Sequence, residues 1–566
     1  MAADENPAAG QSPAVPLSLR KWGIASQYTW VLEVVVLGLA CVWVVGPSTL
    51  LEPDVALGPA SRDLYDHLAL LDLWSLQVDD WNYPNGGSLA PPDLFGMLFA
   101  APWIGWLSRA TAYNLAVVSQ LWAASIAAWA LGRRVGVGLV AGVAFGLSPF
   151  LVGQAMSGEA ETLSAWPLPL WALLLTQDSR KAWAGAGVMG ALAAVGSWYY
   201  GAFAAMVTAG WAGVRLLRDR DPGVLLAPGI FALTIAPWAW VYLDILHSPE
   251  QLFAGPDMRA YLDLYPQALA SMSANPLVWM SQPSPKALHI DSLGAFTVAL
   301  AAVGWWGWKT GPKTSSTRLF WLTMLALGLA LSVGPRLHFD GVVVTEWTPY
   351  RLLADLPVFG RMRMPHRWTL VATLGLAVLA ARGARHMPLA ATVFIFIETV
   401  WFLAPPPTTT SVPPHAAIEH ITGPVLDLPP RTLQHDARGR YLVWQRTHGQ
   451  PTPYALLMQA WSPAIAQEPL FIAVAAEDSQ FQLAGRTSEA RQFRQEDFAL
   501  AVLEWRENPD EDALAGAADR LTDLGFSQVL LHREMLSDYS DSSLMRLLTD
   551  HLGEPVVERP VAVWDL

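Results

Sequence analysis

The sequence has 566 residues, of which 53% are hydrophobic and only 15% charged, with a mean hydropathy of +0.30 and a formal net charge of −13. Soluble domains carry about 25% charged residues, so this composition argues against a soluble enzyme and for many membrane spans, which the 28 Trp also suit. The negative charge argues against nucleic acid as a partner, and the single cysteine, Cys41, excludes a disulfide within the chain.

The N-terminal residues predict a cytoplasmic tail followed by a membrane anchor. Residues 1–20 are small, polar and Pro-containing, so we expect them to be disordered. Arg20 and Lys21 precede an apolar run at 28–45, and no small-residue cleavage site follows it, which favours a retained anchor over a removed signal peptide. Glu33 lies inside this run, where it is either a carboxyl hydrogen-bonded within the helical bundle or a functional group.

Further apolar runs bring the prediction to about 11 spans over residues 21–404, several of them shorter than the roughly 20 residues that a perpendicular helix needs. If Arg20 is cytoplasmic and successive spans cross the membrane in alternating directions, every basic turn falls in the cytoplasm. This holds only if residues 94–107 lie in the outer interface and do not span the membrane. We therefore expect a bacterial inner-membrane protein whose long connections, and everything after the last span, are extracytoplasmic. The runs after the first are 113–131, 137–152, 166–175, 183–198, 201–217, 224–243, 292–308, 319–333, 368–381 and 387–403.

The first outer segment, 46–112, holds two predicted interfacial helices. At 61–79 apolar residues recur at helical spacing, while Asp63, Asp66 and His67 lie on the other side. This pattern predicts a helix with its apolar side in the membrane interface and its carboxylates facing water. Charges that are merely solvated are the alternative to a catalytic role for the two aspartates, and a hydrogen-bonding role is favoured for the histidine over metal binding.

The second outer segment, 153–165, contains two glutamates, Glu159 and Glu161, at i and i+2. Together with aspartates of the first outer segment they offer the oxygen atoms that a divalent cation prefers. A solvated polar hairpin is the alternative. We therefore predict no required cofactor, and a divalent metal stays open.

The outer segment 334–367 gathers cations, against the basic-inside bias. Guanidinium groups match phosphate oxygens bidentately, so these side chains favour the binding of a lipid phosphate. The alternative is that they pair with Asp355, with Glu346 or with lipid headgroups. The candidate phosphate-binding cations of this segment are Arg351, Arg361, Arg363, His366 and Arg367.

The chain after the last span predicts a linker and a separate domain. Residues 405–415 are rich in Pro and Thr, which makes a stiff linker, and 416–566 are enough for their own core. From Ala404 onward the chain has 12 Arg, no Lys and 23 Asp or Glu, so this part carries nearly all of the net negative charge. We expect a small α/β domain that caps the outer face or binds an acceptor, with strands at 425–428, 441–444, 528–531 and 561–564 and helices at 513–524 and 543–552.

Taken in order, several landmarks resemble the GT-C superfamily of membrane glycosyltransferases, and more closely a group of bacterial membrane proteins with the same loop order. Each motif alone is weak, and their order carries the resemblance over most of residues 20–566. The landmarks are Asp63, Tyr83-Pro84-Asn85-Gly86, Ala112-Tyr113-Asn114, Leu331-Ser332-Val333-Gly334-Pro335, Pro349-Tyr350-Arg351-Leu352-Leu353 and Arg363-Met364-Pro365-His366-Arg367.

The resemblance implies a polytopic α-helical membrane protein with a C-terminal α/β extracytoplasmic domain. It also implies transfer of a sugar from a polyprenyl-phosphate donor to an envelope glycan, lipid or protein, with Asp63 as general base and Asp66 as second choice. The late arginines would then stabilise the departing phosphate.

Two other classes stay open. A non-catalytic membrane protein that supports envelope polysaccharide or lipid assembly would tolerate changes in the outer carboxylates. A transporter is less favoured, because we find no internal repeat and only Glu33 as an ionisable residue deep in a predicted span.

Overall fold

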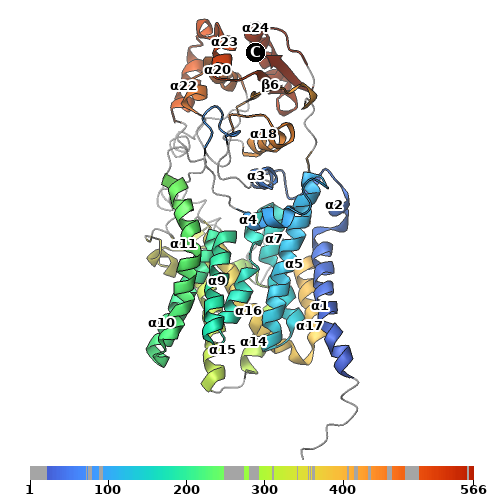
Figure 1. Ribbon diagram of the computed structural model, residues 1–566, viewed down its shortest axis with the longest axis vertical. Helices are drawn as coiled ribbons and strands as arrows, with labels where there is room; N and C mark the ends of the chain where they lie inside the picture. Colours follow the sequence, from blue (N-terminus) through green and yellow to red (C-terminus); the bar gives the residue numbers. More distant parts are fainter. Residues whose placement is uncertain are drawn as a thin grey trace, which may run out of the picture.

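The computed structural model of the chain is elongated, with a helical bundle at one end and a smaller region of helices and strands at the other (Figure 1). The two ends meet at α3, which lies between the bundle and α18 of the C-terminal region. The residues that it describes are 22–71, 73, 79–87, 93–247, 273–279, 292–308, 312–340, 342–354, 356, 359, 362, 364–403, 407–412, 418–430, 435–454, 462–478, 496–557 and 560–566.

Each predicted apolar run contains a helix. The run at 137–152 is divided in two, because Ser148 caps a new helix and Pro149, which has no N–H to donate, occupies its first position. The last run ends in a π-helical turn, η9 (Glu398–Leu403). The helices are α1 (Trp22–Val45), α5 (Arg109–Val135), α6 (Gly138–Gly146), α7 (Pro149–Ser157), α8 (Pro167–Leu175), α9 (Arg180–Gly196), α10 (Trp198–Asp219), α11 (Leu226–His247), α14 (Ala295–Trp306), α15 (Pro312–Ser332), α16 (Thr369–Gly383) and α17 (Pro388–Ile397).

Three helical segments in the described part of the chain are long and apolar enough to cross a membrane: Arg109–Val135, Gly138–Ser157 and Pro222–Asp244. Other helices of the bundle are apolar but shorter. Large side chains on the outside of the bundle are exposed, such as Leu39 at 63% and Trp240 at 76%. Exposed apolar surface of this kind is what a bilayer covers.

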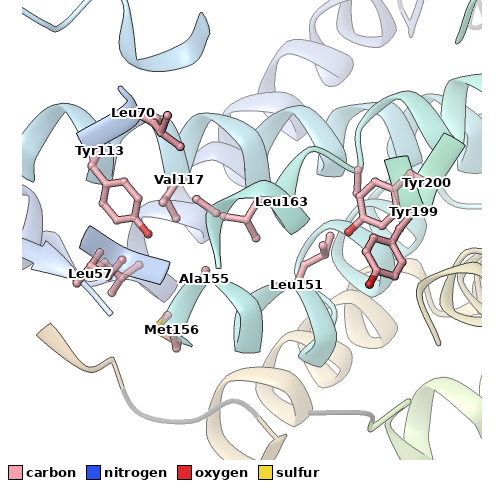
Figure 2. Close-up of a cluster of buried hydrophobic side chains, with 14 of the residues drawn as sticks. Leu57, Leu70, Tyr113, Val117, Leu151, Ala155, Met156, Leu163, Tyr199 and Tyr200 are labelled. Atoms are coloured by element: carbon pink, nitrogen blue, oxygen red, sulfur yellow. The ribbon is translucent and has the colours of Figure 1, made fainter. Parts of the chain in front are cut away.

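Short elements close the end of the bundle that faces the C-terminal region, the upper end of the bundle in Figure 1. At this end Tyr113 and Val117 of α5, Leu151 of α7 and Leu163 of η2 belong to one cluster of buried apolar side chains (Figure 2). Their packing fixes the backbone of the elements that contribute to the site. The short elements are α2 (Pro47–Leu51), β1 (Val55–Leu57), α3 (Arg62–Leu70), α4 (Leu94–Ala100), η2 (Ala160–Leu163), η5 (Pro349–Leu352) and η7 (Pro365–Trp368).

The C-terminal region contains a three-stranded sheet in which β5 (Val425–Leu428) pairs parallel with β6 (Gln528–His532), and β6 pairs antiparallel with β7 (Val561–Asp565). These strands match the predicted ones. Residues 441–444, predicted as a strand, lie instead in a helix. Their side chains are all buried, and a short unbroken apolar run has no periodicity that separates a buried helix from a strand. The helices here are α18 (His435–His448), α19 (Pro463–Ala466), α20 (Pro469–Glu477), α22 (Glu496–Glu507), α23 (Ala517–Asp523) and α24 (Asp538–Leu552).

The predicted linker, 405–415, contributes a strand of its own. β4 (Thr409–Ser411) pairs antiparallel with β1, so Ala56 faces Thr410 across a two-stranded ladder. The chain that leaves the last bundle helix is therefore joined to the beginning of the first outer segment. A hairpin, β2 (Leu337–Phe339) with β3 (Val342–Thr345), follows α15.

Candidate active site

The helix predicted at 61–79 is described as α3, which ends at Leu70. Ser61 caps it by accepting a hydrogen bond of 3.3 Å from the N–H of Leu64, and Asp63 occupies the first turn, where the helix dipole favours a carboxylate. Asp63 is half-buried, whereas Asp66 and His67 are only 5% and 6% exposed.

The prediction that this helix lies on the membrane interface with its carboxylates in water is wrong. Leu64 and Leu68 are fully buried among protein side chains, because α3 packs on the second outer segment. Gly158, at φ 80°, allows this approach, since a Cβ there would lie 3.0 Å from the Cβ of Leu64. The other side of the helix is covered by α18.

The second outer segment supplies two carboxylates to a buried ionic group. Arg367, which precedes α16, donates through Nη2 to Glu159 Oε2 at 3.1 Å and to Glu161 Oε1 at 2.8 Å. The other oxygen of Glu161 lies 2.8 Å from Nε2 of His67, and Nδ1 of His67 lies 3.6 Å from Oδ2 of Asp93. We call these five side chains the ionic cluster.

The local backbone fixes the two glutamates. Helix α7 ends at Gly158, and Glu159 then takes the N-cap position of η2, where its carbonyl accepts a hydrogen bond of 2.7 Å from Thr162 Oγ1. The carbonyl of Thr162 in turn accepts a hydrogen bond from the hydroxyl of Tyr200. The ring of Tyr199 lies against the guanidinium of Arg367, with 4.7 Å between the guanidinium carbon and the ring centroid.

His67 is a cation at neutral pH. Burial disfavours its charged form, but the hydrogen bond to Glu161 and the negative charges of Glu161, Asp93 and Asp63 outweigh burial and raise the pKa of His67 to about 9. The ionic cluster therefore contains two cations, His67 and Arg367, and the carboxylates of Glu159, Glu161 and Asp93.

The carboxylates of the ionic cluster differ in their affinity for protons. Burial, together with repulsion from Glu161 and Asp63, raises the pKa of Glu159 to about 7 although Arg367 opposes the shift. Burial acts in the same direction on Glu161, but Arg367 and His67 outweigh it and hold the pKa of Glu161 below its ordinary value. Burial raises the pKa of Asp93, against the charge of His67. Glu159 is therefore a carboxylate that exchanges protons near neutral pH.

Asp63 borders this cluster. Its charge contributes to the raised pKa of both His67 and Glu159, so it lies within electrostatic reach of the two side chains. Asp63 also keeps partial exposure, which distinguishes it from the fully enclosed Asp66.

The predicted phosphate-binding cations at 351–367 are not all brought to one place. Arg361 and Arg363 lie outside the described residues. Arg351 is exposed on η5, and His366 is fully buried with its ring centroid 6.0 Å from that of Phe150. Arg367 is the predicted phosphate-binding cation that the structure brings to the ionic cluster.

The acidic partners of Arg367 are not the ones that the sequence suggested for these cations. Glu346 lies 3.1 Å from Arg336, and Asp355 lies outside the described residues. The carboxylates that bind Arg367 come from the second outer segment, more than 200 residues earlier in the chain.

The sequence analysis missed Asp93. This residue caps α4 by accepting a hydrogen bond of 2.7 Å from the N–H of Gly96, and the same oxygen accepts from Ser164 Oγ at 3.3 Å. Its place after two prolines and before an apolar helix is a recognisable N-cap pattern. That pattern predicts a structural role, and only the contact with His67 adds a place in the ionic cluster.

Within the described residues, no group of three or more His, Cys, Asp and Glu side chains is arranged to hold a metal ion. Glu159 and Glu161, considered above as ligands of a divalent cation, are bound to Arg367.

Comparison with known proteins gave similarities to solved structures only. No protein-family model matches the sequence, and no curated protein does. The structure is similar to that of arabinofuranosyltransferase AftD from Mycobacteria, with a TM-score of 0.49 and 15% identity over 95% of this chain and 40% of that one. It is also similar to the archaeal oligosaccharyltransferase AglB from Archaeoglobus fulgidus, with a TM-score of 0.42 and 11% identity over 90% of this chain and 70% of that one.

The chain thus spans less than half the length of AftD. Both solved proteins are by name transferases of sugars or oligosaccharides, the class that the sequence resemblance indicated. Because these TM-scores lie below 0.5, only the side-chain geometry described above is used to infer a function.

Proposed function

We propose that this protein is a membrane glycosyltransferase that moves a sugar from a polyprenyl-phosphate donor to an envelope glycan, lipid or protein on the extracytoplasmic face. The observation that carries the proposal is the ionic cluster. Three outer segments, distant in sequence, bring cations and carboxylates together where a lipid-borne substrate would meet the protein.

The proposed orientation places the ionic cluster outside and the basic helix ends in the cytoplasm. Arg382 and Arg385 both donate to the carbonyl of Val135, so the basic turn after α16 lies beside the basic end of α5. The opposite end of α5 contacts α3 and η2, the elements that carry His67 and Glu161, and Arg109 there donates to the carbonyl of Leu68. Basic residues gathered at one end of a bundle favour that end as cytoplasmic, with about 11 spans in an inner membrane.

The proposed reaction needs a base for the acceptor hydroxyl and cations that stabilise the negative charge on the departing phosphate. Asp63 takes the proton of the acceptor hydroxyl, and the oxygen attacks the anomeric carbon of the donor sugar. A new glycosidic C–O bond forms while the C–O bond to phosphate breaks, and polyprenyl phosphate leaves with the electron pair. The positive charges of His67 and Arg367 favour this departure.

The protonation of Glu159 offers a way for phosphate to reach Arg367. Two carboxylates, Glu159 and Glu161, are paired with the guanidinium of Arg367. A phosphate would compete with Glu159, which needs little energy to take up a proton because its pKa is about 7. Uptake of that proton would remove one negative charge and leave Arg367 available to the incoming anion.

The proposal is tested with the full-length protein in lipid nanodiscs, a panel of short polyprenyl-phosphate donors carrying mannose, glucose or arabinofuranose, and bacterial envelope extract as the source of acceptor hydroxyl groups. Release of polyprenyl phosphate, measured by mass spectrometry, is common to any acceptor. We expect Asp63→Asn to slow release by about 100-fold or more, because a general base contributes roughly 10²–10⁴ in rate. Asp79→Asn, an exposed aspartate of the same outer segment, is the matched control.

Full activity of Asp63→Asn at normal protein abundance would remove Asp63 from the mechanism, and Asp66→Asn would then be the next variant to measure. The engagement of Arg367 by two carboxylates favours a second candidate, a non-catalytic protein for envelope assembly, in which the ionic cluster only stabilises the fold. That candidate predicts no release from any donor of the panel.

A further inference from the structure

Described residues between 407 and 454 contact the first outer segment at three places. The first contact is the ladder of β1 and β4, extended by the N–H of Gly58, which donates to the carbonyl of Thr408 at 2.8 Å. Thr410 Oγ1 donates back to the carbonyl of Gly58 at 2.7 Å. The chain just before α3 is therefore fixed by the segment that follows the last bundle helix.

The second contact lies after α3, at residues 80–83. The N–H of Asn82 donates to the carbonyl of Tyr454 at 3.0 Å, and the N–H of Thr452 donates to the carbonyl of Asp80 at 2.9 Å. The buried indole of Trp81 donates to Gln445 Oε1 of α18 at 3.1 Å. Both ends of the stretch that contains α3 are thus bonded to residues that follow the last bundle helix.

The third contact is between α18 and α3 themselves. Nε of Arg440 donates to the hydroxyl of Tyr65 at 3.2 Å, and its guanidinium carbon lies 5.6 Å from the centroid of that ring. Gly439 touches the base of the same side chain, since a Cβ built on Gly439 would lie only 2.5 Å from the Cβ of Tyr65. A Cβ cannot swing away as the end of a long side chain does, so any larger residue at 439 must move one helix relative to the other.

Tyr65 and Asp63, the proposed base, lie on opposite sides of α3. Two residues along a helix correspond to a rotation of about 200°, so the side that carries Tyr65 faces α18 while Asp63 and His67 face the ionic cluster. On that side α3 is held by Glu161, at 2.8 Å from His67, and by Arg109, which donates to the carbonyl of Leu68 at 3.0 Å. α3 is therefore held by contacts with the bundle on one side and with α18 on the other.

We propose that Gly439 and Arg440 are positioning residues: α18 fixes the position of α3 and thereby sets where Asp63 stands relative to the ionic cluster. This inference rests on the proposed function for its catalytic consequence. A displacement of about 1 Å in a catalytic group can cost 100-fold in rate, and the close approach at Gly439 leaves less room than one methyl group requires.

The test compares Gly439→Ala with Gly210→Ala in the full-length protein. Gly210 is a helical glycine with no atom within 4 Å of its built Cβ, so it controls for the change of residue type. For Gly439→Ala we expect kcat for polyprenyl-phosphate release to fall by about tenfold or more while KM for the donor changes by less than about twofold. We also expect faster amide hydrogen exchange in residues 62–70 and unchanged exchange in residues 138–157.

A second pair of variants keeps the inference testable if Gly439→Ala folds poorly. Tyr65→Phe and Arg440→Ala each remove the hydrogen bond between the helices, so the double variant should be no slower than the slower single variant. Wild-type kcat together with wild-type exchange in residues 62–70 of Gly439→Ala would overturn the inference. If the wild type releases no polyprenyl phosphate, the proposed function fails, and hydrogen exchange alone decides whether α18 holds α3.

Discussion

The ionic cluster, at the end of the bundle that faces the C-terminal region, and the Asp427–His532 pair within that region both place charge away from water. His532 Nε2 lies 2.9 Å from Asp427 Oδ1, and the two side chains are 0% and 1% exposed. The other oxygen of Asp427 accepts a hydrogen bond of 2.7 Å from Thr452, and the ring of His532 stacks on Trp444 with 4.6 Å between centroids. Both oxygens of this carboxylate are satisfied, as a buried structural pair requires.

In the ionic cluster the carboxylates outnumber the cations. It contains three carboxylates and two cations, and the half-buried Asp63 adds a fourth negative charge beside it. Burial opposes the charge of Asp427, yet His532 holds the pKa of Asp427 below its ordinary value, whereas Glu159 has a pKa of about 7. Asp427 is bonded to His532 and Thr452 and keeps a lowered pKa, whereas Glu159 lies beside other carboxylates and has a pKa near neutrality, as groups at catalytic sites often do.

The largest effect that we expect is a loss of stability when His532 is replaced. His532→Ala would leave Asp427 buried without its cation, which costs about 3–5 kcal/mol for a buried pair. We expect lower thermal stability of the variant in detergent, followed by circular dichroism. The pH profile of polyprenyl-phosphate release from the folded fraction should stay that of the wild type, and a shifted profile would contradict the distinction drawn here.

An intermediate effect is expected from pH. The folded pKa of His67 is raised from 6.5 to about 9, so its contribution to stability is fully present below about 6.5 and is lost as pH rises through 9. A shift of this size corresponds to on the order of 3 kcal/mol. Denaturation between pH 7 and pH 10 should therefore show a loss in the wild type that is absent in His67→Gln, and equal losses in the two proteins would refute it.

The smallest effect should come from Glu159→Gln. Glutamine imitates the protonated form, which is already about half populated at pH 7 when the pKa is about 7, so release should stay within about threefold of wild type. Glu161→Gln should be clearly slower, because the ionised Glu161 binds both His67 and Arg367. Rates between pH 6 and pH 8.5 test this order, and a reversed order would exclude Glu159 as the exchanging carboxylate.

Much of the framework follows from local pattern. Apolar runs in the bundle place its helices because their apolar side chains must be buried or covered by lipid, and strands β5, β6 and β7 lie where the short apolar stretches predict them. The segments that hold Asp63, Glu159 and Arg367 likewise follow from charge and hydropathy as connections between apolar runs. Local pattern failed at 441–444, where an unbroken apolar run suits both a strand and the observed helix.

Periodicity and composition act over a few helical turns, so they are enough to predict apolar helices joined by charged connections. Which of those charges meet depends on the packing of the whole chain. Glu161 binds His67 across 94 positions and Arg367 across 206, and Arg440 meets Tyr65 across 375. No local preference encodes such pairings, since they depend on how whole helices pack and on which side chains that packing removes from water.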